Sequence, residues 1–158
     1  MKNFINLLIL LLFSNTLVFA APQDSVKVNP LNPVAEAISI YQISFVTSDT
    51  LYPDGKIAII FPADFDLSKV IMAGSTSING GFKVSVQGNK VILRRTGLGR
   101  SIMPKERVEV KFANVKNPSV VNKQFSLKVE FQNKSNQQIQ RTEEVKVALK
   151  GKASNLSR

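Results

Sequence analysis

The chain has 158 residues, with 21 Lys and Arg against 11 Asp and Glu, and its formal net charge is +10. It contains neither histidine nor cysteine. It therefore lacks the usual base for a serine nucleophile, the thiol nucleophile, the common ligands of transition metals and any disulfide. A domain of this length can be held by its apolar core alone, because it buries roughly two-thirds of the surface that its unfolded chain exposes.

The charge is unevenly distributed along the chain. Residues 21–66 hold two lysines against six acidic residues, whereas residues 67–158 hold eighteen Lys and Arg against five glutamates. Such asymmetry is typical of a surface that binds polyanions, and a high net charge also keeps a protein soluble. The sequence leaves both interpretations open.

The first twenty residues predict a secretory signal peptide. Lys2 precedes an apolar run over residues 4–13, and Ala20 takes the small-residue position before a cleavage site at Ala21. The apolar run is shorter than the roughly 20 residues that a membrane-spanning helix needs. We therefore expect residues 1–20 to be removed and the protein to be secreted, periplasmic or on the cell surface.

The remainder of the chain shows no internal repeat and no domain boundary. We expect residues 21–149 to form one domain. The polar and aperiodic residues 150–158 are expected to form a flexible basic tail.

Apolar residues recur with a period of two, which is typical of strands with one buried face. Clusters of Gly, Pro, Asn and Asp separate these runs and supply turn residues. The runs predict an all-β fold, an antiparallel immunoglobulin-like β-sandwich of about seven to nine strands. The clearest strands are residues 25–28, 41–45, 56–61, 82–87, 90–93, 107–112, 124–131 and 143–149.

One irregularity interrupts this pattern. Tyr41, Ile43 and Phe45 share one parity, whereas Ile38 and Ile40 have the other. A bulge or a change of sheet near Ile40 and Tyr41 would reconcile the two sets.

The stretch YPDGKIAIIFPADFDLS predicts a central strand. Pro53, Asp54 and Gly55 have turn chemistry, and residues 56–61 follow with apolar side chains on both faces. Pro62 lacks an amide hydrogen and ends the ladder.

Several short motifs spread over residues 35–149 have a familiar order. They are Thr47-Ser48, Gly55, Phe61-Pro62, Asn114-Val115 and Asn117-Pro118-Ser119. With them the chain resembles the immunoglobulin-like β-sandwich modules of prokaryotic cell-surface and adhesion proteins. The resemblance implies a spacer or binding unit without catalytic residues, and a single basic copy argues against a spacer.

Four aspartates flank the predicted central strand but cannot form one catalytic pair. Asp49 and Asp54 precede the strand, and Asp64 and Asp66 follow it, so a strand of ~3.3 Å per residue separates the pairs by roughly 20 Å. A glycosidase pair requires about 5–9.5 Å. Asp64 and Asp66 could share a face towards Ca²⁺, but such an ion takes about six to eight oxygen ligands, and turn roles explain both residues equally well.

Catalysis by a serine would need Ser101 with Lys105, which nothing distinguishes from a charged loop. We predict no catalytic residues, no metal and no cofactor.

The sequence RRTGLGRS is the sharpest candidate for binding. Its glycines would let the backbone approach a ligand, and its arginines would grip carboxylate or phosphate. With lysines of the preceding hairpin it could bind an anionic ligand, although a solvated hairpin exit explains it too. The candidate residues are Lys83, Lys90, Arg94, Arg95 and Arg100.

The predicted function is non-catalytic docking to a surface protein or to an anionic envelope polymer such as an acidic polysaccharide. The alternative is a structural subunit joined through edge strands, with the first strand and residues 139–149 as candidate edges. Nucleic acid is not a predicted partner, because the chain has no Trp and only two Tyr for stacking on bases. Contact with a membrane would be peripheral at most, and the oligomeric state is left open.

Overall fold

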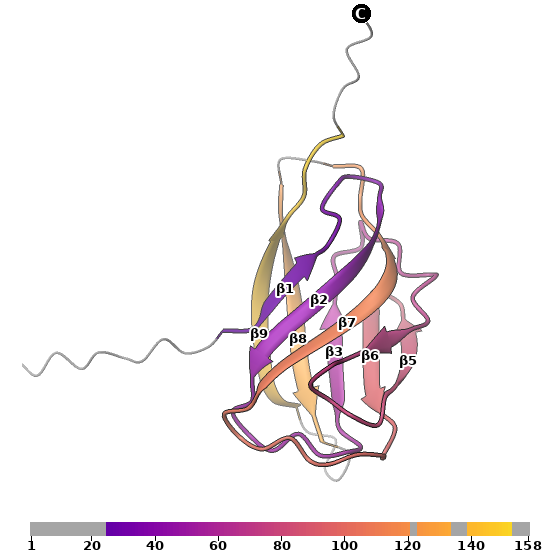
Figure 1. Ribbon diagram of the computed structural model, residues 1–158. Coiled ribbons are helices and arrows are strands. Elements are labelled where there is room, and N and C mark those ends of the chain that lie inside the picture. Colours follow the sequence, from indigo (N-terminus) through magenta and orange to yellow (C-terminus); the bar gives the residue numbers. More distant parts are fainter. Residues whose placement is uncertain (1–24, 121–122, 134–138, 153–158) are drawn as a thin grey trace, which may run out of the picture.

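The computed structural model describes residues 25–120, 123–133 and 139–152 (Figure 1). The predicted signal peptide and residues 153–158 of the predicted tail lie outside the described residues. No helix long and apolar enough to cross a membrane occurs in the part that is described.

The described residues form nine strands, in agreement with the predicted all-β fold. They are β1 (Lys27–Pro30), β2 (Ile38–Val46), β3 (Lys56–Ile60), β4 (Ala73–Gly74), β5 (Phe82–Gln87), β6 (Lys90–Arg95), β7 (Arg107–Lys116), β8 (Gln124–Gln132) and β9 (Ile139–Ala148).

Two antiparallel sheets pack face to face (Figure 1). One has the order β1-β2-β7-β4 and the other has the order β5-β6-β3-β8-β9. The predicted hairpin is present as β5 and β6, whose turn is Gly88-Asn89. The predicted central strand is also confirmed, because β3 pairs with β6 on one side and with β8 on the other.

The core lies between the sheets and contains the inward-facing residues of the alternating strands. Its aromatic centre holds Tyr41, whose ring lies 5.5 Å from that of Phe61 and 6.0 Å from that of Phe112. The Tyr41 hydroxyl donates a hydrogen bond of 2.7 Å to Asn117 Oδ1. Burial raises the pKa of Tyr41, so the hydroxyl remains a donor.

Strand β2 corrects one detail of the sequence prediction. Its alternation continues without a break, so Ser39 and Tyr41 are buried while Ile38 and Ile40 face outwards. A register shift does occur here, but the extra residue belongs to β7, where Ala113 and Asn114 lie opposite Ile40. Asn114 has a φ of 68°, a left-handed conformation that asparagine tolerates better than most residues.

The two predicted edge strands are edges, and they lie beside each other. Strands β1 and β9 flank the same side of the sandwich (Figure 1). Beyond their ends the backbones of Val34 and Lys150 form a parallel bridge, with Ala35 N donating to Lys150 O at 2.8 Å. Each of these edges is therefore partly covered by the other.

The opposite edges are β4 and β5, which the sequence did not identify. Beyond the two residues of β4, serine hydroxyl groups form hydrogen bonds with the backbone of β7 in place of a partner strand. The amide of Glu109 donates to Ser77 Oγ at 2.9 Å, and Ser75 Oγ donates to the Glu109 carbonyl. The backbone amide and carbonyl of Glu109 at the edge of β7 thus have hydrogen-bond partners without a longer partner strand.

Candidate binding surface

Three of the five predicted binding residues, Lys83, Lys90 and Arg94, share the outer face of the five-stranded sheet. Lys83 on β5 lies opposite Arg94 on β6, and Arg94 lies opposite Lys56 on β3. The side chains of Lys83, Arg94 and Lys56 point away from the core. Their sequence neighbours Val84, Leu93 and Ile57 point into it. The three cations form a continuous row across three strands, and in the described part of the chain none forms an ion pair with a carboxylate.

Lys90 belongs to the same face but has a partner. Its Nζ lies 3.1 Å from Glu130 Oε2 on β8. The pair spans the intervening strand β3, where the small side chain of Ala58 leaves room for it. Lys90 therefore contributes less free charge to this face than Lys83 or Arg94.

The middle of the face is apolar. Ala58, Ile60 and Ile92 point outwards from β3 and β6, and Ala58 is only 3% exposed beneath its longer neighbours. Six basic residues and two glutamates surround this strip, a net charge of +4. They are Lys56, Lys83, Lys90, Arg94, Lys128, Lys146, Glu130 and Glu144. We call these eight charged residues and the apolar strip the basic face.

Arg95 does not belong to the basic face, which corrects the sequence prediction. Its side chain is 1% exposed and points into the sandwich with Val91 and Leu93. Its guanidinium donates to the carbonyl of Leu51 at 2.7 Å and to that of Arg100 at 2.6 Å. Burial, and after it the charge of Arg100, lowers the pKa of Arg95. An external polymer cannot reach this group.

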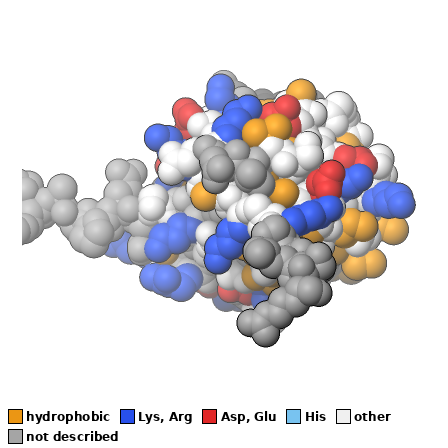
Figure 2. Space-filling view, turned by 90° about the horizontal axis from the view of Figure 1, so that it is seen from above, with side chains coloured by type: hydrophobic (Ala, Val, Ile, Leu, Met, Phe, Trp, Pro, Cys, Tyr) orange, Lys and Arg blue, Asp and Glu red, His pale blue; other side chains and the backbone are white. Residues whose placement is uncertain are grey.

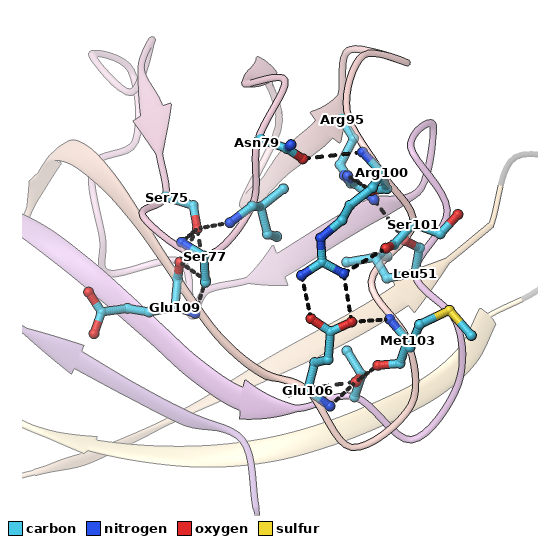
Figure 3. A network of polar contacts seen from close by, with 12 residues as sticks. Leu51, Ser75, Ser77, Asn79, Arg95, Arg100, Ser101, Met103, Glu106 and Glu109 are labelled. Carbon is cyan, nitrogen blue, oxygen red and sulfur yellow. Dashed lines mark hydrogen bonds and ion pairs between the residues drawn. The ribbon is translucent and has the colours of Figure 1, made fainter.

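Arg100 is also held within the protein (Figure 3). Its two terminal nitrogens bind the carboxylate of Glu106 at 2.9 and 2.7 Å, and the same carboxylate accepts the amide of Met103 at 2.7 Å. The hydrogen bond from Arg100 is the main cause that lowers the pKa of Glu106 to about 2. Arg100 is exposed, and its hydrogen bonds fasten a loop of the protein itself.

Gly99 of the loop RRTGLGRS and Gly80 of the neighbouring loop allow a close approach to the protein's own backbone, whereas the sequence suggested a ligand. A Cβ atom on Gly99 would lie 2.6 Å from Asn79 O, and one on Gly80 would lie 1.8 Å from Leu98 O. Both glycines have positive φ angles near 90°. The two loops therefore pack together only because both positions lack a side chain.

The aspartates after β3 have partners of their own. Asp64 Oδ2 lies 3.3 Å from the Nζ of Lys123, and Asp66 Oδ1 accepts the amide of Ser68 at 2.9 Å. The hydrogen bonds from Ser68 lower the pKa of Asp66. Within the described residues, no three acidic, histidine or cysteine side chains are close enough together to hold a metal ion.

Three lysines of the basic face were not among the predicted binding residues. Lys56, Lys128 and Lys146 follow the same outward parity as Lys83 and Arg94 in their own strands. The alternation of side chains shows which residues of each strand point outwards. Only the order of the strands in the sheet brings these residues together. The same parity rule would have placed Arg95 inside, since it alternates with Val91 and Leu93.

No protein-family model matches the chain, and no curated protein sequence matches it significantly. Solved structures do match. A cohesin module from a family 33 glycoside hydrolase of Clostridium perfringens has a TM-score of 0.54 at 14% identity, over 82% of this chain and 99% of that one.

Two further matches have lower scores. A non-cellulosomal cohesin from Archaeoglobus fulgidus has a TM-score of 0.45 at 11% identity, over 80% of this chain and 91% of that one. An uncharacterized protein from Nocardia farcinica, described as having an immunoglobulin-like fold, has a TM-score of 0.42 at 12% identity, over 78% and 98%. At 14% identity the likeness to the module from Clostridium perfringens concerns the fold alone. The expected all-β sandwich is confirmed by the two packed antiparallel sheets of the described residues.

Proposed function

We propose that the protein is an exported, non-catalytic binding module that docks an acidic partner on the basic face. The observation that carries this proposal is the row of Lys83, Arg94 and Lys56, three adjacent cations without a carboxylate partner in the described residues. Like charges directly opposite each other on neighbouring strands destabilise a sheet by roughly 0.2–1 kcal/mol. An anionic partner that binds across the row attracts all three cations and offsets the repulsion between them.

The partner chemistry follows from the middle of the face. An apolar strip surrounded by charged side chains is the usual composition of a protein docking surface. The strip of Ala58, Ile60 and Ile92 therefore favours a surface protein with an acidic patch. An anionic envelope polymer is the second candidate, since the row of cations alone would suffice to hold it.

The fold supports a binding role over a chemical one. The similar module from Clostridium perfringens is a cohesin module of a larger glycoside hydrolase. In the described part of this chain, Ser101 and Lys105 make no hydrogen bond to each other. Secretion or a cell-surface location belongs to the same proposal and depends on the N-terminal sequence.

Assembly through edge strands is the competing role. The mutual covering of β1 and β9 counts against it, because these edges already meet within one molecule. The outer edge of β5 is the better candidate for such pairing, since among the described strands β5 pairs with β6 alone.

Retention on immobilised dextran sulfate and on polyglutamate tests the proposal. The first variant carries Lys56→Gln, Lys83→Gln and Arg94→Gln on the basic face. The control carries Lys69→Gln, Lys111→Gln and Lys116→Gln, which remove the same charge from elsewhere on the protein. The basic-face variant should elute at clearly lower salt than the wild type, and the control should elute close to it. Equal shifts for both variants would mean that net charge alone causes retention, and the proposal would be wrong.

A further inference from the structure

Strand β5 has an open outer edge. Its six residues, Phe82–Gln87, pair with β6 on one side, and no described strand pairs with the other side. An unpaired strand edge presents a row of backbone N–H and C=O groups that can bind another chain, and natural proteins often shorten, bulge or break such edges with proline. β5 contains no proline, and its register with β6 shows no shift.

The other edges of the sandwich are closed in different ways. Strands β1 and β9 cover each other in part through the bridge between Val34 and Lys150, and β1 ends at Pro30. Beside the two residues of β4, the hydroxyl groups of Ser75 and Ser77 bond the backbone of β7. Among the described edge strands, β5 is therefore the one most open to a further strand.

The register of β5 identifies the backbone groups at its outer edge. Just before β5 begins, the amide of Thr96 donates to the Gly81 carbonyl at 3.3 Å. Every second residue of an antiparallel pair bonds its partner strand, so the residues of β5 that bond β6 continue from Gly81 in steps of two. The residues between them turn their N–H and C=O groups outwards, where no other described residue bonds them. They are Phe82, Val84 and Val86.

The same three residues have apolar side chains that the protein covers only in part. Phe82, Val84 and Val86 point towards the core but are half-buried, whereas Val91 and Leu93 on the paired strand β6 are fully buried. The strand of the other sheet on this side of the sandwich is β4, which has only two residues. A strand added beside β5 would cover these side chains if its own inward side chains were apolar.

The charge beside the edge favours an acidic occupant. Lys83 lies on the outer face of β5, and the row of cations continues from it through Arg94 to Lys56. An Asp or Glu opposite Lys83 on an added strand would form a favourable cross-strand pair. The end of the sandwich in Figure 2 is different, since acidic side chains lie among the basic and apolar ones there. A second copy of the chain suits the edge poorly, because pairing through β5 would place two basic faces side by side in one sheet.

We infer that the acidic partner binds by adding an extended segment to β5 as a further antiparallel strand. Apolar residues of this segment face inwards beside Phe82, Val84 and Val86, and they alternate with Asp or Glu on the outer face beside Lys83. In this mode of recognition backbone hydrogen bonds provide affinity and alternate side chains provide specificity. The antiparallel orientation matches every strand pair within the two described sheets. The inference rests on the proposed docking function and names the form in which the partner binds.

Calorimetric titration of the protein with the peptide acetyl-Ser-Val-Asp-Val-Glu-Val-Ser-amide tests the added strand. In the antiparallel orientation the valines lie opposite the outward-bonding residues of β5, so their N–H groups face β5 and those of Asp and Glu face away. We expect N-methylation of the valines to weaken binding at least about tenfold, since it removes hydrogen bonds and keeps the charge. N-methylation of Asp and Glu is the matched control and should change binding little. Equal binding of the two methylated peptides, or no binding of the unmodified peptide, would overturn the inference.

A proline in β5 provides a second measurement. Val84→Pro removes an outward N–H and keeps the hydrogen bonds to β6, since proline fits an edge strand where the N–H faces solvent. It should weaken binding of the peptide at least about tenfold and leave retention on polyglutamate close to the wild type, because all cations remain. Val84→Thr keeps the N–H and is the control. Equal peptide affinities for the two variants would overturn the inference, and so would a dimer of the protein alone that Val84→Pro dissociates.

Failure of the docking function itself has a different signature. Retention on polyglutamate would then not depend on Lys56, Lys83 and Arg94, whichever methylated peptide binds. If retention depends on these cations while the two methylated peptides bind equally, docking on the basic face stands and the added strand is wrong.

Discussion

Lys90 Nζ lies 3.1 Å from Glu130 Oε2, although the two residues are on strands that do not pair with each other. The pair crosses over β3 at Ala58, the smallest side chain in the middle of the basic face. A partly exposed pair of this kind contributes only about 0.2–1 kcal/mol to stability. Its larger effect is on the charge of the face, since Glu130 offsets one of the six basic residues.

Replacing Glu130 therefore strengthens binding to anions. Glu130→Gln releases Lys90 and adds one positive charge to the basic face, so elution from dextran sulfate should require more salt than for the wild type. Glu109→Gln adds the same charge to the opposite sheet and serves as the control. An unchanged elution of Glu130→Gln would contradict the assignment of this face.

The adjacent residues Arg94 and Arg95 should separate binding from stability. Arg95→Met removes the two charged hydrogen bonds that the guanidinium donates to the carbonyls of Leu51 and Arg100, so we expect it to lower the free energy of unfolding by about 2–3 kcal/mol. Arg94→Met should change stability little and lower the salt needed for elution. Urea unfolding and column retention of both variants check this, and a loss of retention in Arg95→Met equal to that in Arg94→Met would refute it.

The sequence predicted those parts of the fold that depend on neighbouring residues. The turn at Gly88-Asn89 and the alternation of β5 and β6 are local, and both were predicted correctly. The turn before β3 and the end of its ladder near Phe61 and Pro62 were predicted for the same reason.

The candidate site was harder to predict because it depends on the order of strands. Lys56 and Arg94 are far apart in the sequence and become neighbours only when β3 pairs with β6. The error at Arg95 had another cause. The prediction for the loop RRTGLGRS rested on its composition, whereas Gly99 and Arg95 of this loop contact the protein's own backbone.

The packing of the two loops predicts a sensitive glycine. In Gly80→Ala a Cβ would lie 1.8 Å from the Leu98 carbonyl oxygen at a φ of 90°, and we expect a loss of about 3 kcal/mol or more. Gly74→Ala is the control, since no heavy atom lies within 4 Å of its Cβ. It should stay within about 0.5 kcal/mol of the wild type in the same urea titration. Equal stabilities for the two variants would contradict the observed packing.

The bond between Arg100 and Glu106 predicts a pH dependence. The pKa of Glu106 falls from its ordinary value near 4.5 to about 2 in the folded protein. A lowered pKa stabilises the fold above pH 4.5, and this contribution is lost as the pH falls towards 2. The melting temperature of Glu106→Gln should thus lie below that of the wild type at pH 7, and the gap should close between pH 4.5 and 2. A gap that stays constant over this range would contradict the role of the ionised carboxylate.

Site-specific photo-crosslinking in cells that produce the chain tests the central claim most directly. A photoreactive residue at Ser85, on the outer face of β5 opposite Ile92, lies on the basic face, whereas one at Ser44 on β2 lies on the other sheet. We predict covalent adducts with an acidic partner from position 85, and their loss when Lys56, Lys83 and Arg94 are replaced by Gln. The absence of any adduct at position 85, or adducts that persist in that triple variant, would contradict docking on the basic face.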